Sequence, residues 1–246
     1  MMKNQTALTI QTAGHFHQGW KSCRDGAGCL PGLADHPDHR AAKYEGDAEA
    51  ALRVVKSCLG QTHLTMAKIF IDGLRMKGMD PILVPSYRKG SQNRIATTLA
   101  EYLGEELGVD VDKDIKAEGS TAQKDLAGVS RIFNTPHFTG KVHSGKTYVL
   151  VDDYVHTGGS LNKLKNYIES QGGRVVFGFA LASPSGQMQK IEPASDDQIS
   201  NLEKRFSSSV VNWMKNKLGD LHLLTRADAD YVLNHGREMF EAMSCR

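Results

Sequence analysis

Long apolar runs, cysteine and excess charge of either sign are all scarce in this sequence. No uninterrupted apolar stretch approaches the roughly 20 residues of a transmembrane helix, so we expect no membrane span. Four cysteines in 246 residues are too few for a disulfide framework. With 30 Lys+Arg against 28 Asp+Glu, the net charge of +2 gives no general basic field for nucleic acid or an anionic membrane. Any anion recognition must therefore come from a local site.

The first thirty residues carry charged side chains and histidines where a signal peptide would be apolar, so we expect a cytoplasmic protein. The hydrophobic content of 40% suits an ordinary globular chain with a sizeable core.

The hydrophobic pattern alternates between helix and strand periods. Helical spacing predicts helices over 47–59, 64–76, 93–107, 161–170, 196–206 and 210–218, with a last helix opening at Thr225. Apolar runs predict strands over 81–85, 147–151 and 174–182, with further candidates over 109–116 and 221–224. Because strand, helix and strand follow one another over 147–182, we predict an α/β fold with a twisted, mostly parallel sheet flanked by helices.

Two stretches lack periodicity. Residues 14–44 are rich in His, Gly, Asp and Pro and predict loop, and a long glycine-containing loop over 117–146 indicates a functional or mobile segment. We expect an irregular N-terminal lobe over 1–45, a core over 46–190 and a mainly helical C-terminal extension over 191–246 packed on that core.

The most informative segment joins the strand over 147–151 to the following helix. The carboxylates Asp152 and Asp153 end the strand, and a turn opens the helix with His156, Thr157, Gly158, Gly159 and Ser160. Ligands of parallel sheets bind beyond the carboxyl ends of the strands, and glycines there let backbone N–H groups approach an anion at a helix N-terminus. Adjacent carboxylates accept hydrogen bonds from vicinal hydroxyls. The acidic pair alone favours a solvated strand end before a helix cap, whereas the whole segment favours a sugar-phosphate site.

This segment resembles the phosphoribosyl-diphosphate (PRPP) signature of type I phosphoribosyltransferases. The resemblance implies that Asp152 and Asp153 position the ribose for catalysis through its hydroxyls. Residues 156–160 would hold the 5′-phosphate, and Mg²⁺ would be held through PRPP and water rather than directly by the protein. His156 stands where Thr is usual in the family, and it either donates to the phosphate or marks an altered ligand preference.

Two further segments match the family in order, so the resemblance covers about residues 81–182. The loop after the first core strand resembles the diphosphate-binding loop, with Ser86, Tyr87, Arg88 and Lys89 as its expected contacts; the alternative is a surface turn. The spacing of Gln123, Leu126, Arg131, Asn134 and Phe138 resembles the ComF-like branch, where this loop is a flexible flap. Lys124 and Arg131 would then close over the diphosphate, although either side chain would also suit a solvated loop.

The resemblance implies transfer of the 5-phosphoribosyl group from PRPP to a nitrogen acceptor such as a nucleobase, with release of diphosphate, by a protein that is commonly a homodimer. The alternative is a regulatory or accessory protein that binds a nucleotide or sugar phosphate without turnover. Such a protein would act through a protein or nucleic-acid partner. The C-terminal helices carry basic residues for such a contact, or for a solvated face: Lys204, Arg205, Lys215 and Lys217.

The first sixty residues also contain several possible zinc ligands: His15, His17, Cys23, Cys29, His36, His39 and Cys58. Cys23 and Cys29 do not have the spacing of a zinc module, so scattered loop histidines and free thiols are favoured over a structural zinc. Trp20, Phe177 and Phe179 could stack on a base, but the alternation of the two phenylalanines on an apolar strand favours core packing.

Overall fold

The computed structural model describes residues 6–15, 32–118, 129–133, 137–184, 186 and 188–244. Its central five-stranded sheet has the order β2-β5-β6-β1-β7. The strands are β1 (Leu8–His15), β2 (Pro81–Pro85), β5 (Thr147–Tyr154), β6 (Arg174–Ser183) and β7 (Gln189–Ile191). Four of them run parallel, and only β7 pairs antiparallel, with β1. The predicted α/β class and mostly parallel sheet are confirmed.

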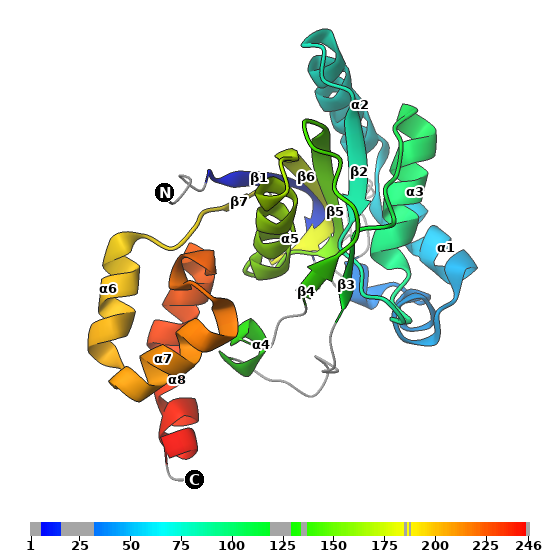
Figure 1. Ribbon diagram of the computed structural model, residues 1–246. Coiled ribbons are helices and arrows are strands. Elements are labelled where there is room, and N and C mark those ends of the chain that lie inside the picture. The colour runs from blue at the N-terminus through cyan, green and yellow to red at the C-terminus, as the bar shows by residue number, and fades with distance from the viewer. Residues whose placement is uncertain are drawn as a thin grey trace.

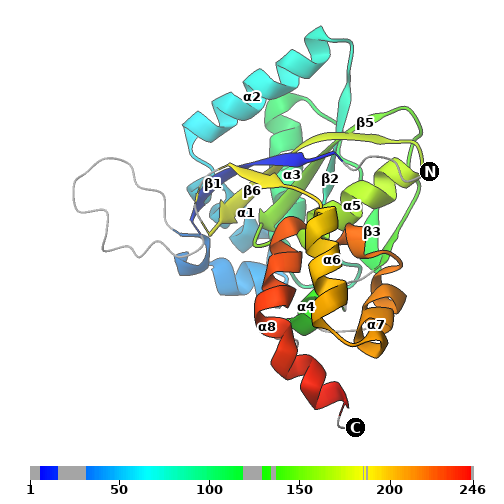
Figure 2. The ribbon, with the colours of Figure 1, turned by 90° about the vertical axis from the view of Figure 1, so that its left-hand side faces the viewer.

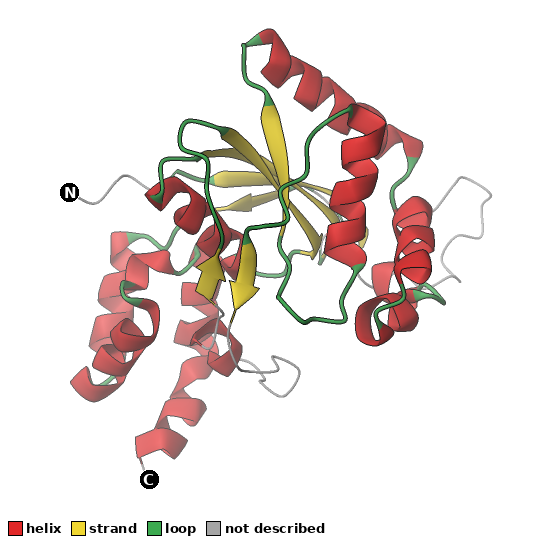
Figure 3. Ribbon diagram, turned by 45° about the vertical axis from the view of Figure 1, so that its right-hand side comes forward, coloured by secondary structure: helices red, strands yellow, loops and turns green. Residues whose placement is uncertain are grey.

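Helices cover both faces of this sheet (Figures 1 and 3). The helices α1 (Ala48–Cys58), α2 (Gln61–Met76) and α3 (Ile95–Leu107) pack on one face, and α5 (Gly159–Ser170) packs on the other. The pleat of β5 explains this arrangement, because successive side chains point to opposite faces. Val149 and Val151 join the core under α1–α3, whereas Tyr148 and Leu150 join the core under α5.

The C-terminal helices form a separate unit beside the sheet (Figure 2). Helices α6 (Asp196–Arg205), α7 (Ser208–Leu218) and α8 (Arg226–Ser244) pack with the short α4 (Val129–Phe133) around a core of their own. The predicted cap of the last helix is confirmed. Thr225 Oγ1 accepts a hydrogen bond from the Asp228 N–H at 3.0 Å, and Asp228 Oδ2 accepts one from the Thr225 N–H at 3.2 Å.

Several strand predictions were wrong or incomplete. Neither β1 nor β7 was predicted from the sequence, although β1 lies inside the sheet. The expected strand over 221–224 is a 3₁₀ turn (Leu221–Leu223). The prediction was wrong because three leucines around His222 are too few to show whether the period is that of a strand or a helix. Of the expected strand over 109–116, only a bridge from Val111 to Leu83 and the first residue of a short strand, β3 (Lys116–Glu118), are found.

The expected long loop over 117–146 contains structure of its own. Besides α4, a short antiparallel ribbon pairs β3 (Lys116–Glu118) with β4 (His137–Thr139). Phe177 and Phe179 are core residues, as predicted, and the Phe177 ring stacks on Phe70 with centroids 3.9 Å apart. Trp20 lies outside the described residues.

The zinc hypothesis depends partly on residues outside the described ranges, namely His17, Cys23 and Cys29. Cys58 is a buried free cysteine, and burial raises the pKa of its thiol to about 11. In the part of the chain that the structure describes, no group of three His, Cys, Asp or Glu side chains is placed to hold a metal ion. Within the same ranges, no helix is long and apolar enough to cross a bilayer.

Candidate functional site

A cleft of about 1140 Å³ opens at the carboxyl ends of β2 and β5. Three sequence segments that were expected to form a site line this cleft together: the loop after β2, the acidic pair and the turn before α5. Their lining residues include Ser86, Tyr87, Arg88, Lys89, Asp152, Asp153, His156, Thr157, Gly158, Gly159 and Ser160. Parallel pairing of β2 with β5 causes the meeting, because it brings the ends of the two strands to one edge of the sheet.

The acidic pair lies within β5 rather than after it, because the strand continues to Tyr154. Pleating places Asp153 on the same side as Val149 and Val151, toward α3. There, Asp153 Oδ2 accepts hydrogen bonds from Lys43 Nζ and from Asn93 Nδ2, both at 2.9 Å.

The two carboxyl groups differ in electrostatics. Burial raises the pKa of Asp152 well above its ordinary value, and the neighbouring Asp153 charge raises it further. Burial acts in the same direction on Asp153, but the Lys43 ammonium and the hydrogen bonds from Lys43 and Asn93 outweigh it and lower the pKa. The pair therefore combines a carboxyl group that is easily protonated with a paired carboxylate.

The turn before α5 has the backbone shape of an anion site. Gly158 has a φ of 80°, in the left-handed region, and α5 begins at the next residue. A Cβ at Gly158 would lie 2.5 Å from Ile191 Cδ1, so only glycine fits between the turn and β7. His156 and Ser160 are exposed at the cleft, which leaves both side chains accessible to a ligand.

The loop after β2 is held by backbone hydrogen bonds. The Ser86 N–H donates to the Val151 carbonyl at 2.7 Å, and the Lys89 N–H donates to the Ala117 carbonyl at 3.0 Å. Lys89 Nζ also lies 3.4 Å from Glu118 of β3, with two thirds of its side chain exposed. This exposed pair is weak, so the Lys89 ammonium remains able to turn toward an anion.

Two flap residues were expected at this cleft. Arg131 belongs to α4, whose neighbouring residue Ile132 lines the cleft. Lys124 lies outside the described residues.

Sequence reasoning missed several cleft residues: Lys43, Asn93, Lys163, Asp228 and Tyr231. Lys43 comes from a single π-helical turn (Ala41–Glu45), in a stretch expected to be irregular, and reaches Asp153 across 110 positions. Asn93 is the first residue of the helix predicted over 93–107, and the sequence pattern predicts no role for it at the site. Asn93 lies two residues before α3, and its Oδ1 accepts a hydrogen bond from the Ile95 N–H at 3.1 Å; an Asn near the start of a predicted helix is a signal for such a contact.

No protein-family model matches this chain. Among curated proteins, it is similar to Protein TraN of Escherichia coli, with 31% identity over 209 residues, 83% of this chain and 45% of the relative. It is also similar to a ribose-phosphate pyrophosphokinase of Ralstonia nicotianae, with 32% identity over 111 residues, 45% of this chain and 30% of the relative. The chain thus spans less than half the length of these curated relatives.

Among solved structures, the chain is similar to a purine phosphoribosyltransferase from Pyrococcus horikoshii, with 20% identity and a TM-score of 0.32. That match covers 51% of this chain and 76% of the other. It is also similar to an adenine phosphoribosyltransferase from Leishmania donovani, with 14% identity, a TM-score of 0.33 and coverage of 56% and 70%.

Proposed function

We propose that this chain binds PRPP with Mg²⁺ in the cleft and transfers its 5-phosphoribosyl group to a nitrogen acceptor, releasing diphosphate. One observation carries the proposal. An acidic pair, a glycine turn at a helix N-terminus and a loop with Arg88 and Lys89 line one cleft, although they come from different segments of the chain. Their chemistry matches the three parts of PRPP, namely vicinal hydroxyls, a 5′-phosphate and a diphosphate.

In this proposal the acidic pair binds the ribose. Asp153 is already fixed by Lys43 and Asn93, and it also accepts a hydrogen bond from the Tyr154 N–H at 2.9 Å. Asp152 Oδ1 accepts one from the Asp153 N–H at 2.9 Å. These hydrogen bonds hold the two carboxyl groups in a fixed orientation, so that they can accept hydrogen bonds from the ribose hydroxyls without rearranging.

The same partners bear on Mg²⁺. Because both oxygens of Asp153 already accept hydrogen bonds, direct coordination by Asp153 would break existing contacts. The donor set fits an ion held by PRPP oxygens and water beside Asp152 and Asp153, and the ion would supply positive charge to the diphosphate.

The chemistry would need charge compensation more than a covalent intermediate. Departure of diphosphate from the anomeric carbon leaves an oxocarbenium-like sugar, and Arg88 and Lys89 would stabilise the departing anion. The turn at residues 156–160 would hold the 5′-phosphate, with His156 and Ser160 as side-chain donors. Lys124 and Arg131 would close over the diphosphate and keep water from the sugar.

In this proposal, each part of the chain has its own role. Residues 46–190 would form the PRPP-binding core, joined by β1 from the N-terminal segment, and residues 191–246 would form the helical extension. The proposed relation to the ComF-like branch depends only on the spacing of residues in the expected flap, from Gln123 to Phe138.

Binding of PRPP with Mg²⁺ tests the site. We expect the double variant Asp152→Asn with Asp153→Asn to lose PRPP binding while its far-ultraviolet circular dichroism stays unchanged. Asp80→Asn is the matched control, because Asp80 is exposed and precedes β2 at the other end of the strand. Unchanged PRPP affinity in the double variant would overturn the assignment.

Turnover is a separate measurement. Release of diphosphate with a panel of nucleobases would show transfer and identify the acceptor. Tight PRPP binding without release for any acceptor would instead favour the regulatory or accessory role.

A further inference from the structure

The cleft continues past the turn at residues 156–160 to side chains that the proposed ribose 5-phosphate site does not use. Ile132 of α4, Lys163 of α5, and Asp228 and Tyr231 of α8 line this part. The whole cleft, at about 1140 Å³, exceeds the roughly 300–1,000 Å³ of pockets for drug-sized ligands. It therefore has room for more than one phosphorylated ribose.

This part of the cleft adjoins the end where the 5′-phosphate would bind. Thr225 Oγ1 donates to the Thr157 carbonyl at 3.0 Å, and a Cβ at Gly159 would lie 2.8 Å from Asp228 Oδ2. Lys163 follows Gly159 by four residues and so lies on the same side of α5. Asp153 of the acidic pair instead contacts Lys43 and Asn93, which are not among the residues of this part of the cleft.

Lys163 is suited to bind an anion. Its Nζ donates to the Ile132 carbonyl at 3.2 Å, and an ammonium group has three hydrogens to donate. Burial lowers the pKa of Lys163 to about 8, because the Asp228 charge only partly offsets the loss of hydration. A phosphate bound beside Lys163 would add a second negative charge, and this charge would stabilise the protonated ammonium that burial disfavours.

We propose that Lys163 forms a second phosphate subsite beyond the turn at residues 156–160, so that the protein prefers ribose ligands with a 5′-diphosphate over those with a 5′-monophosphate. Asp228 keeps the Lys163 side chain at the subsite, while Ile132 and Tyr231 form its wall. This inference rests on the proposed function, because it needs the first phosphate at the turn.

AMP and ADP test the subsite, since they differ only by the second phosphate. By calorimetry near pH 7 without divalent metal, we expect ADP to bind about tenfold more tightly than AMP. Lys163→Met should lower ADP affinity to that of AMP and leave AMP affinity within about twofold. Lys146→Met is the control, because Lys146 is exposed and precedes β5 at the other end of that strand.

A pH series adds a measurement that a structural role of Lys163 would not change. Among the described residues that line this end of the cleft, the other titratable groups are Asp228, Tyr231 and His156. As pH rises through about 8, Lys163 loses its proton and the preference for ADP should fall. In Lys163→Arg the preference should persist to about pH 9.5, because the guanidinium stays charged.

Equal affinity for AMP and ADP in the wild-type protein would overturn the subsite, as would an equal loss for both nucleotides in Lys163→Met. PRPP binding that depends on Asp152 and Asp153, combined with equal AMP and ADP affinities, would reject the subsite alone. Failure to bind PRPP, AMP and ADP would reject the proposed function and the subsite together.

Discussion

Asp152 and Asp153 are neighbours in the chain, but the pleat of β5 gives them different surroundings. Asp153 meets Lys43 and Asn93 on the side of α3, and its pKa is lowered, whereas burial and the Asp153 charge raise the pKa of Asp152. Two adjacent aspartates at the end of one strand can thus have pKa values that are shifted in opposite directions. The sequence pattern predicted the pair but not its partners, because the contact with Lys43 spans 110 positions and has no local signal.

Lys43→Met tests the ion pair at the residue scale. Removing Lys43 leaves the Asp153 carboxylate buried without its cation, and we expect a loss of about 1–3 kcal/mol in the free energy of unfolding at pH 7. This is below the roughly 3–5 kcal/mol of fully buried pairs, because the Lys43 side chain is still 22% exposed. Urea denaturation measures the loss.

The sign of the pH dependence follows from the pKa shift. The lowered pKa of Asp153 makes its contribution to stability present above the ordinary value of 3.8 and lost as pH falls through the lowered pKa. The difference between wild type and Lys43→Met should therefore shrink toward acid pH. Lys113→Met removes an exposed pair with Glu101, at 2.8 Å, and serves as control. An equal loss in both variants would contradict a special role for Lys43.

At the scale of elements, local pattern was sufficient where a segment had a clear period and a boundary signal. The helices α1 and α5 and the strands β2, β5 and β6 follow from such patterns to within a few residues. In contrast, β1 has polar residues at Gln11 and Thr12 and is a strand because it pairs with β6, about 170 residues later. Pairing over such a distance cannot be deduced from a local window.

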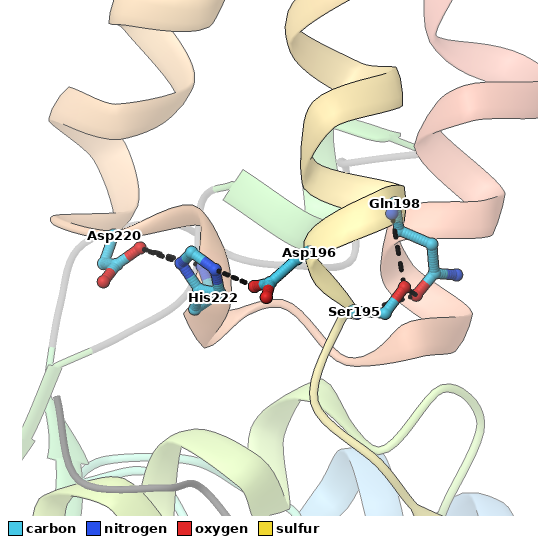
Figure 4. Close-up of polar contacts among 5 residues, drawn as sticks. All are labelled: Ser195, Asp196, Gln198, Asp220 and His222. Atoms are coloured by element: carbon cyan, nitrogen blue, oxygen red, sulfur yellow. Dashed lines mark hydrogen bonds and ion pairs between the residues drawn. The ribbon is translucent and has the colours of Figure 1, made fainter.

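His222 provides a test at the scale of elements, because it ties the turn before α8 to the start of α6 (Figure 4). Its Nδ1 lies 2.9 Å from Asp220 Oδ1, and its Nε2 lies 3.2 Å from Asp196 Oδ1. The hydrogen bond to Asp220 is the main cause that raises the pKa of His222 above 6.5, and Asp196 adds to it.

We expect the C-terminal helices to be more stable at about pH 6 than at about pH 9. A raised pKa makes the His222 contribution fully present below 6.5 and lost as pH rises through the folded-state value. Titration by NMR should give a His222 pKa above 6.5 that falls in Asp220→Asn. His143, which is exposed, is the reference histidine. A His222 pKa at or below 6.5 would contradict this electrostatic link.

In the whole molecule, the turn at residues 156–160 contacts both the core of the sheet and the helical unit, beside the hydrogen bond from Lys163 of α5 to Ile132 of α4. Through α5 it belongs to the core of the sheet, and through Ile191 and Thr225 it meets β7 and the start of α8. The core of α4, α6, α7 and α8 contains none of the sheet residues. Ligand binding at the turn should therefore affect the helical unit as well as the sheet.

Thr225→Val tests this coupling, because it removes both the cap of α8 and the hydrogen bond to the Thr157 carbonyl. We expect the variant to lose about 1 kcal/mol of stability from the cap and to bind PRPP several-fold more weakly. Ser207→Ala is the matched control, since Ser207 Oγ caps α7 by accepting from the Val210 N–H at 3.5 Å. It should lower stability without changing PRPP affinity.

Hydrogen exchange gives the same coupling a direct measure. If the turn links the two cores, saturating PRPP should slow amide exchange in α8 as well as in β5 and α5 of the wild-type protein. In Thr225→Val the slowing of α8 exchange by PRPP should be lost while that of β5 remains, because the variant lacks the hydrogen bond that joins Thr225 to the Thr157 carbonyl. Protection confined to β5 and α5 in the wild-type protein would show that the helical unit responds independently of the site.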